Sequence, residues 1–483
     1  MKGFDAASGS AARDIDDNNL TLRRRSRILY MSAPLATSAI RTVRTNSVGS
    51  GLRPKPRPDR ELLGMAEGDA ADWCKRVERE FGLWADSRRA CDASGMNSFY
   101  ELQQLAMQAW LMSGDVFAAV RHRDPEPMRP YGLRLQLLEA DRISTPSGTG
   151  SAAGFMSTGR TPDGNAIYDG VEVDRMGLAV AYHVSNAHPW EIPDAGAMPE
   201  HVRIPIWGEE TGLPNILHVM EAERPGQYRG VPYLAQVIEP LLQMRRYTES
   251  ELVAAVVESF FTAFVKTDEP GEVPFNEIVP PGESGGARDD DEYEMGPGQV
   301  NFMEPGEDIV FADPKRPSSG FDSFVGAMCR QIGAALEIPG ELLLKNFNSS
   351  YSASRAALLE AWKAFRMRRA WFVDDFCTPV WELWMSEAVA RGRIHAPGFF
   401  TDPLAHAAYL QCEWVGPSQG QLDPVKEVTA ELKAIGSGLT THEAAAIRLN
   451  GSNWDENMDR LDAERTRMGA PAGTGDTEGE IDE

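Results

Sequence analysis

Hydrophobic positions recur with a helical period over several stretches of this chain. Trp73, Val77 and Phe81 are spaced four residues apart, and a second apolar stripe runs over 102–111. Apolar side chains at that spacing fall on one face of a helix. We therefore predict two helices within 61–120 whose stripes face a core.

Short apolar runs replace this period over 133–219. Asp-Gly pairs at 163–164 and 169–170 mark turns between them, which is the pattern of β strands. His183 and His218 fall inside two of these strands, as core or surface residues. Together with the preceding helices, the strands predict a mixed α+β domain.

Two helical patterns flank an irregular segment in the middle of the chain. The first runs over 240–266 and the second over 321–337, where a Pro-Gly pair stops it. The segment between them, 267–318, is dense in Pro, Gly and acidic residues, and we predict a small β excursion there. The acidic tip of this excursion consists of Asp289, Asp290, Asp291 and Glu292.

A polar loop and a long aromatic helix follow. The loop comprises Lys345, Asn346, Phe347, Asn348, Ser349 and Ser350. The helix is predicted over 352–390, with a kink or a split at Pro379, and we interpret its aromatic side chains as core. Further on, Pro424 opens another helix, and Thr440 with Glu443 has the spacing of a capping box.

The N-terminal 60 residues differ in charge from the rest. They carry 12 Lys/Arg against 5 Asp/Glu, a local net charge of +7, and the remaining chain carries 36 against 67. The prolines in 53–58 predict an extended segment after helices that end near Gly49. Three interpretations stay open: a solvated arm that docks on an acidic neighbouring subunit, a nucleic-acid-binding arm, or an ordinary solvated helix face. For the first, the candidate residues are Arg23, Arg24, Arg25 and Arg27.

The overall charge of −24 argues against a protein that grips DNA tightly, because such proteins are usually basic. An acidic chain either avoids nucleic acid or lets it pass, and acidity also simply favours solubility. Five scattered cysteines without a CxxC pair argue against a disulfide framework or a zinc site. The sequence shows neither a signal peptide nor a membrane span, so we expect synthesis in a cytoplasm.

Catalytic motifs are lacking in the sequence. Neither GxxxxGK[ST] nor HExxH occurs, which argues against a P-loop ATPase and a zinc protease. Asp374 and Asp375 are adjacent on a predicted helix and point about 100° apart, so they cannot share a substrate. The acidic tip at 289–292 has no rigid frame for a metal. We expect no enzyme, no cofactor and no metal.

Five segments, in order, resemble the lambda-type phage portal proteins. They are ARDIDDNN with NSVGSGLRPKP, ERPGQYRGVPYLAQVIEPLL, MEPGEDIVFADPKRPSSGFDSFV, IPGELLLKNFNSSYSASRAALLEAW and EWVGPSQGQLDPVKE. The resemblance implies a predominantly helical α+β portal fold with wing, stem, clip and crown regions. The implied regions are an N-terminal arm (1–60), wing (61–235), first stem helix (236–266), clip (267–318), second stem helix (319–338), tunnel loop (339–352), long wing helix (353–423), crown (424–470) and a disordered acidic tail (471–483).

By the same resemblance, the chain would form a ring, dodecameric in the family, at one capsid vertex of a virion. Double-stranded DNA would pass through the ring during packaging and ejection, with the loop 345–350 facing it. The acidic clip tip would meet the terminase large subunit and later the head-completion or adaptor proteins, and the ring would sit among major capsid protein. A terminase-associated protein and a capsid or scaffold protein are the alternatives; the missing P-loop argues against the first, and two long helices around a compact excursion argue against the second.

Overall fold

The computed structural model describes most of the chain. The described residues are 9–147, 149, 158–189, 200–259, 263–266, 284–285, 300–303, 321–347, 350–420 and 423–468. The chain divides into two compact units, one of Met1–Gln236 with Leu336–Glu483 and the other of Val237–Ala335. The described elements are both helices and strands, which confirms the predicted α+β class.

Helices open the first unit, as their apolar periods predicted, but the prediction of helix as far as residue 120 is wrong, because Asp115–His122 forms strand β2. They are α1 (Ala11–Ser32), α2 (Pro34–Ser47), α3 (Arg60–Leu63), α4 (Glu67–Ala85), α5 (Arg88–Cys91) and α6 (Phe99–Ser113). α6 begins at a complete capping box, in which the Ser98 side chain accepts from the Glu101 N–H and the Glu101 side chain accepts from the Ser98 N–H. The predicted extended segment after α2 is also confirmed: β1 (Arg53–Pro56) pairs antiparallel with β13 (Cys412–Val415).

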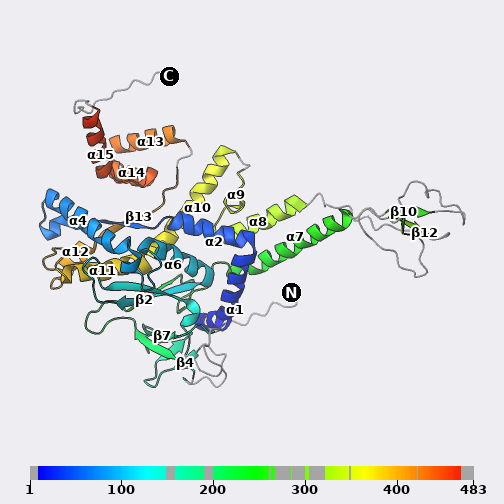
Figure 1. Cartoon of the computed structure of the whole chain (residues 1–483), viewed down its shortest axis with the longest axis horizontal. Coiled ribbons are helices and arrows are strands. Elements are labelled where there is room, and N and C mark those ends of the chain that lie inside the picture. The colour runs from blue at the N-terminus through cyan, green and yellow to red at the C-terminus, as the bar shows by residue number, and fades with distance from the viewer. Residues whose placement is uncertain are drawn as a thin grey trace. The chain divides into compact units, whose positions relative to one another are not determined.

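Two antiparallel sheets confirm the strands predicted over 133–219. One has the order β3-β2-β9, with β2 (Asp115–His122), β3 (Leu133–Glu139) and β9 (Ile216–Met220). The other has the order β4-β5-β6-β7-β8, with β4 (Thr158–Arg160), β5 (Ala166–Tyr168), β6 (Val171–Val173), β7 (Ala179–Ser185) and β8 (His201–Pro205). The 3-10 turn η1 (Ala140–Arg142) follows β3, and α6 packs on the three-stranded sheet (Figure 1). Phe117, Tyr182 and Ile216 belong to the buried cluster that joins the two sheets.

An aromatic core joins α4 and α6 to the long C-terminal helices. The Phe81 ring lies 5.0 Å from Trp384 in an edge contact, and Phe99 stacks on Phe376 at 5.9 Å. Trp84 and Trp381 are also fully buried here. Aromatic pairs in these geometries add about 1 kcal/mol each to the area they bury. The interpretation of the long helix's aromatics as core is thereby confirmed.

The long helix is interrupted before Pro379. α10 (Tyr351–Phe372) passes into the π-helical turn η3 (Val373–Cys377), and α11 (Thr378–Ala390) continues from it with Pro379 in its first turn. A proline lacks the N–H that would bond one turn back, and the wider π turn accommodates this loss. The prediction of a break at this proline is confirmed.

Further helices complete the first unit: α9 (Gly340–Leu344), α12 (Pro403–Leu410), α13 (Pro424–Gly436), α14 (His442–Asn450) and α15 (Trp454–Arg467). The predicted cap of α14 is wrong by one residue. Thr441, not Thr440, accepts the first-turn N–H of Ala444. Glu443 therefore occupies the second helical position, and its carboxylate binds Arg57 and Lys55 instead of closing a capping box.

The second unit contains α7 (Ile238–Ser259), which follows the turn η2 (Ala235–Val237), and α8 (Phe321–Ala335). The two helices lie side by side (Figure 1), with the Tyr247 ring stacked 5.6 Å from Phe321. The helix predicted over 240–266 is too long, because β10 (Ala263–Lys266) is a strand. It pairs in parallel with β12 (Val300–Met303), which also pairs with β11 (Ser284–Gly285). The Phe-Val pair in β10 favours a strand once a partner is available. None of the helices in the described residues is long and apolar enough to cross a bilayer.

Candidate functional site

The helix α1 turns its polar side toward the protein. Asp16, Asn19, Arg23 and Ser26 are buried, at spacings that place them on one helix face. Leu20, Ile28 and Met31 are exposed, Met31 by 78 %. This is the reverse of the usual amphipathic arrangement, in which the apolar stripe faces the core. α1 is therefore attached to the body largely through hydrogen bonds and charges.

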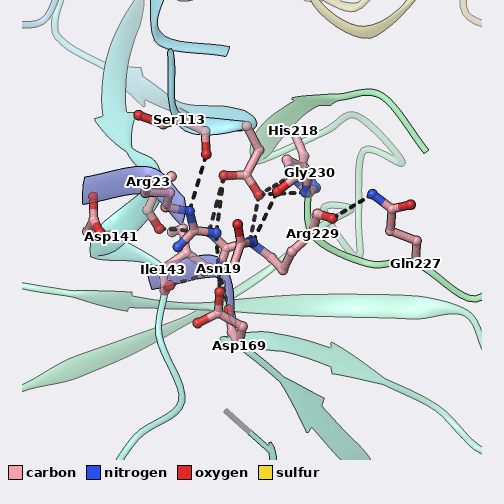
Figure 2. A network of polar contacts seen from close by, with 12 residues as sticks. Asn19, Arg23, Ser113, Asp141, Ile143, Asp169, His218, Gln227, Arg229 and Gly230 are labelled. Atoms are coloured by element: carbon pink, nitrogen blue, oxygen red, sulfur yellow. Dashed lines mark hydrogen bonds and ion pairs between the residues drawn. The ribbon is translucent and has the colours of Figure 1, made fainter. Parts of the chain in front are cut away.

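The centre of this attachment is a buried ion pair between Asp115 and Arg229, drawn in Figure 2. Arg229 Nε donates to Asp115 Oδ2 at 2.6 Å, and Nη2 donates to Oδ1 at 3.2 Å. The same guanidinium donates to the carbonyl oxygens of Ala140 and Ile143, at 2.8 and 3.0 Å, and to that of Asp169. A buried ion pair is tolerated only when its remaining donors are satisfied in this way.

Two further groups complete the coordination of Asp115. The Gly230 N–H donates to Oδ2 at 3.1 Å, and His218 Nε2 lies 3.4 Å from the same oxygen. Burial by itself would raise the pKa of Asp115, but the guanidinium groups of Arg229 and Arg23 hold it well below its usual range. Burial lowers the pKa of His218, which favours a neutral imidazole stacked on Phe117 at 4.1 Å. Asp115 is therefore an anion held by protein donors.

Arg23 links α1 to this centre. Its Nε donates to the Ser113 carbonyl at 3.3 Å, and its Nη2 lies 3.2 Å from Asp169 Oδ2 and 3.6 Å from Asp115 Oδ1. Arg27, one turn later, donates to Ser113 Oγ at 3.0 Å and pairs with Asp141. The prediction of a solvated arm is therefore wrong for Arg23 and Arg27, because the chain's own carboxylates and carbonyls hold them.

The neighbouring Arg24 and Arg25 are exposed. They point away from the network because successive helical residues are separated by about 100°. A contact of these two side chains with a neighbouring subunit stays a prediction.

Position 230, within the ERPGQYRGVPYL segment, requires a glycine. A Cβ at this position would lie 1.8 Å from the carbonyl oxygen of Gly114, so only glycine allows the two backbones to approach. The approach lets the Asn19 side chain donate to the Gly230 carbonyl at 3.0 Å (Figure 2). Gln227 supports the segment by donating to the Arg229 carbonyl at 2.9 Å. Arg229 and Gly230 thus form a fixed seat for α1.

The predicted tunnel loop begins directly after α9. Lys345 adopts a left-handed conformation with φ 53°, and its N–H and that of Asn346 both bond to the Glu341 carbonyl. This geometry ends a helix and satisfies its last carbonyls. Lys345, Asn346 and Phe347 are exposed, and Ser350 is the N-terminal cap residue of α10. The loop's origin is anchored by Ser38 in α2, which donates to the Leu343 carbonyl at 2.8 Å.

Several predicted site residues lie outside the described residues. They are Asn348 and Ser349 of the loop, and Asp289, Asp290, Asp291 and Glu292 of the acidic tip. The roles suggested for them stay predictions.

A second anchor holds α10 against α2. Arg369 donates to the carbonyl oxygens of Ser47, Asn46 and Pro417, at 2.7, 2.9 and 2.7 Å. The first two belong to the C-terminal end of α2, where a cation complements the helix dipole. Burial, followed by repulsion from Arg366, lowers the pKa of Arg369 to about 10, so the side chain is still charged at neutral pH. α10 carries this residue about five turns after the predicted tunnel loop and so fixes the direction in which the helix leaves it.

One group among the described residues has a spacing that could suit a metal. Ligand atoms of Glu139, Asp141 and His188 lie within 4.8 Å of one another. Arg27 already pairs with Asp141, and its positive charge opposes the binding of a cation beside it. The cluster is better described as part of the ionic attachment of α1.

Comparison with known sequences decides the family. A profile described as phage portal protein, lambda family, matches residues 1–369, which include α1, the Arg229 seat and the tunnel loop. The chain belongs to the lambda family of phage portal proteins. The resemblance carried by the five sequence segments is thereby confirmed.

Individual portal relatives match over most of their length. Portal protein B of Escherichia phage lambda is 23 % identical over 446 residues, covering 87 % of this chain and 79 % of the relative. The portal protein of Escherichia phage N15 is 22 % identical, with coverages of 94 % and 86 %. The probable portal protein of Halomonas phage phiHAP-1 is 25 % identical, with coverages of 95 % and 83 %.

Solved structures of gene transfer agent particles also align with this portal chain. One is the neck of the native particle computed with C12 symmetry, with a TM-score of 0.41, 13 % identity and coverages of 90 % and 94 %. Another is the virion of the native particle, with a TM-score of 0.40, 14 % identity and 94 % coverage of both chains.

The buried network is the feature that sequence reasoning missed. Its members come from α1, β2, the turn after β5 and the segment before η2, and nothing in their local spacing links them. The one local signal is the Arg-Gly pair in the YRGVPY segment, which was recognised only as part of the family pattern. The burial of Arg23 could not be read from a run of three arginines, because a solvated helix face has the same composition.

Proposed function

We propose that this chain assembles into a closed ring at one capsid vertex and that double-stranded DNA is packaged and ejected through the ring. The observation that carries the proposal is its membership of the portal family over residues 1–369. Portal proteins connect the phage head to the tail, and a ring is the assembly that gives such a connector a channel. The ring would contain about twelve copies by the same family resemblance.

Uncovered apolar helix faces support the assembly of several copies. α13 has no buried side chain, and Val425, Val428 and Leu432 are exposed by 77, 39 and 56 %. An adjacent side of the helix is engaged within the chain, where Glu431 pairs with Arg448 at 3.0 Å. An amphipathic helix with its apolar side in water is unfavourable, and a second copy of the chain can cover it. In a ring every copy gains this contact.

The charge of the chain supports passage of DNA rather than retention. The net charge is −24, and acidic walls repel the phosphate backbone. Tight binding would require many Lys or Arg contacts to phosphates, each of which would oppose sliding. Exposed Lys345 and Asn346 at the start of the tunnel loop offer weak and exchangeable contacts. We propose that the loop Lys345–Ser350 lines the narrow part of the channel.

The ring would not supply energy for packaging. Since the sequence has no P-loop, ATP hydrolysis would come from the terminase large subunit, which we propose docks at the excursion between α7 and α8. Head-completion or adaptor proteins would use the same surface after packaging, and the major capsid protein would surround the ring. The acidic residues at 289–292 are the proposed contact, and this role is untested.

Electron microscopy of the purified protein tests the ring directly. Rings with a central hole are the expected result; polyhedral shells would favour a capsid protein, and ATP turnover would favour a terminase. A protein that stays monomeric at all concentrations contradicts the proposal.

Packaging assays test the channel loop separately. Residues 345–350 would be replaced by a Gly-Ser segment of equal length, which leaves α9 and α10 connected. We expect rings to form normally while packaging or retention of DNA fails. A control variant, Lys363→Gly, changes an exposed residue of α10 away from the loop and should package DNA. Unchanged packaging by the loop variant would show that the loop does not line the channel.

A further inference from the structure

Asp16 is a buried carboxyl group that receives no hydrogen bond from the part of the chain that the structure describes. The residue is only 5 % exposed, and neither Oδ1 nor Oδ2 has a hydrogen-bond partner there. The next buried residue on this face of α1, Asn19, likewise has a side-chain oxygen without a donor. An ionised carboxylate in this position would lose its hydration without gaining protein hydrogen bonds, which is costly.

The charges around Asp16 are already balanced without it. Its neighbours are Arg23 on α1, Asp115 on β2, Asp169 in the turn after β5 and Arg229 in the segment before η2. Two guanidinium groups face two carboxylates, which pair with them at 2.6–3.6 Å. A third carboxylate therefore adds one uncompensated negative charge to the buried network.

The imidazole that faces Asp115 does not restore this balance. His218 on β9 is buried, and burial lowers its pKa, so it contributes no positive charge at neutral pH. Asp16 also does not belong to the group of possible metal ligands found among the described residues. Protonation of the Asp16 carboxyl group itself neutralises the charge in its buried position.

We propose that α1 is a proton-dependent latch, held against the body while Asp16 carries a proton and loosened when that proton is lost to solvent. The reversed amphipathicity of α1 supports this, because four of its seven buried residues are polar or charged and the buried apolar ones are Ala11, Ala12 and Leu29, which give little hydrophobic attachment to outlast the change. Burial and then the charge of Asp169 raise the pKa of Asp16 to about 7, against the opposing attraction of Arg229 and Arg23. The latch therefore responds near neutral pH. It concerns the single chain and holds whether or not rings form.

The direction of the response follows from the raised pKa. The folded state binds a proton that the released state, with an ordinary carboxyl, does not. The attachment of α1 is thus fully present at acidic pH and weakens as the pH rises through about 7. Between the ordinary carboxyl pKa of about 4 and the raised pKa of about 7, the equilibrium constant for opening should grow about tenfold per pH unit, because one proton is released on opening; above about 7 both states are deprotonated and the constant levels off.

Hydrogen exchange of α1 between pH 5 and 8.5, corrected for the intrinsic dependence of exchange on pH, tests the latch in the full-length protein. In the unmodified chain, we expect protection of α1 to fall about tenfold per unit from pH 5 to about 7 and to level off above that value. Asp16→Asn, which is neutral at every pH, should abolish that slope, while Asp17→Asn, an exposed neighbour, should keep it.

Two results would overturn the proposal. One is a pH-independent protection of α1 in the unmodified chain, which can be recognised even if Asp16→Asn fails to fold. The other is an unchanged slope in a folded Asp16→Asn variant. Since ring formation is monitored in the same samples by microscopy, failure of the latch is distinguishable from failure of the proposed portal assembly.

Discussion

Single residues decide how α1 is seated. Arg229 satisfies three carbonyl oxygens and pairs with the carboxylates of Asp115 and Asp169, and Gly230 allows the close backbone approach that brings Asn19 into range. Replacing either residue by a chemically similar one would remove some of the contacts that hold α1. A lysine at 229 would retain the charge but not the planar fork of donors. The seat therefore depends on side-chain shape as much as on charge.

Replacement of Gly230 by alanine should destabilise the protein by about 3 kcal/mol, because the added Cβ would lie 1.8 Å from the Gly114 oxygen and force the backbones apart. The midpoint of chemical denaturation measures this change. Gly226→Ala is the matched control: it lies in the same segment and has nothing within 4 Å of an added Cβ. Its left-handed φ of 76° should cost only about 1 kcal/mol. Equal effects of the two substitutions would show that the close approach is unimportant.

At the scale of elements, the helices are positioned by polar anchors at their ends as well as by apolar packing. Arg369 binds the carbonyl end of α2, and Glu387 of α11 accepts from the N–H groups of Gly132 and Leu133 at 2.6 and 2.9 Å. Helix ends leave carbonyl groups unpaired, and Arg369 satisfies those at the end of α2, whereas Glu387 ties α11 to the start of β3. The tunnel loop inherits its position from α9 and α10, which are fixed in this way.

Arg369→Gln should destabilise the packing of α10 on α2 by about 3 kcal/mol, because buried carbonyl groups would lose their donors. Thermal or chemical denaturation gives the magnitude. Arg366→Gln removes the same type of side chain from an exposed position on the same helix and should change stability by less than about 0.5 kcal/mol. If both variants were equally stable, the anchor would have no structural role.

The exposed stripe of α13 gives a second prediction at this scale. Leu432→Gln should weaken each contact between copies by about 2 kcal/mol, the value of burying a leucine side chain, while the fold of the single chain is preserved. The fraction of rings in dilution series, measured by native mass spectrometry, reports the effect. Lys433→Gln places the same amide about 100° around the helix and should leave assembly almost unchanged. Rings of undiminished stability in Leu432→Gln would exclude the stripe from the interface.

For the whole molecule, the distribution of charge separates the N-terminal 60 residues, at +7, from the strongly acidic remainder. The burial of Arg23 and the ion pair of the partly buried Arg27 with Asp141 mean that part of this positive charge stabilises the subunit itself. What remains on the outer face of α1 includes Arg24 and Arg25, beside the exposed Leu20 and Ile28. This combination would suit an acidic surface of a neighbouring copy.

The double variant Arg24→Gln with Arg25→Gln should therefore give rings that dissociate at lower salt than the unmodified rings, because ion pairs between copies are screened by salt. Removing the whole segment would be a poor test, since α1 and α2 belong to the core of the subunit. Arg76→Gln with Arg79→Gln, two exposed positions on α4, is a charge-matched control. Equal salt resistance of the two double variants would show that Arg24 and Arg25 do not form ion pairs between copies.

The sequence by itself determined the helices, the strands over 133–219, the extended 53–56 segment and the family, because each has a local signal in periodicity, turn residues or a run of matching residues. It also located a loop after α9, in which Lys345, Asn346 and Phe347 are exposed. It missed the strands at Asp115–His122 and Ala263–Lys266, because each choice depends on pairing with a strand that is distant in the sequence, Ile216–Met220 for the first and Val300–Met303 for the second.

Only the tertiary structure decided which face of α1 is buried. The burial of Arg23 depends on its ion pairs with Asp115 and Asp169, which lie about 90 and 150 residues away along the chain. The pKa of Asp16 depends on burial and on the same distant charges. Electrostatic free energy is set by distance and burial in space, and neither quantity is contained in the local spacing of residues.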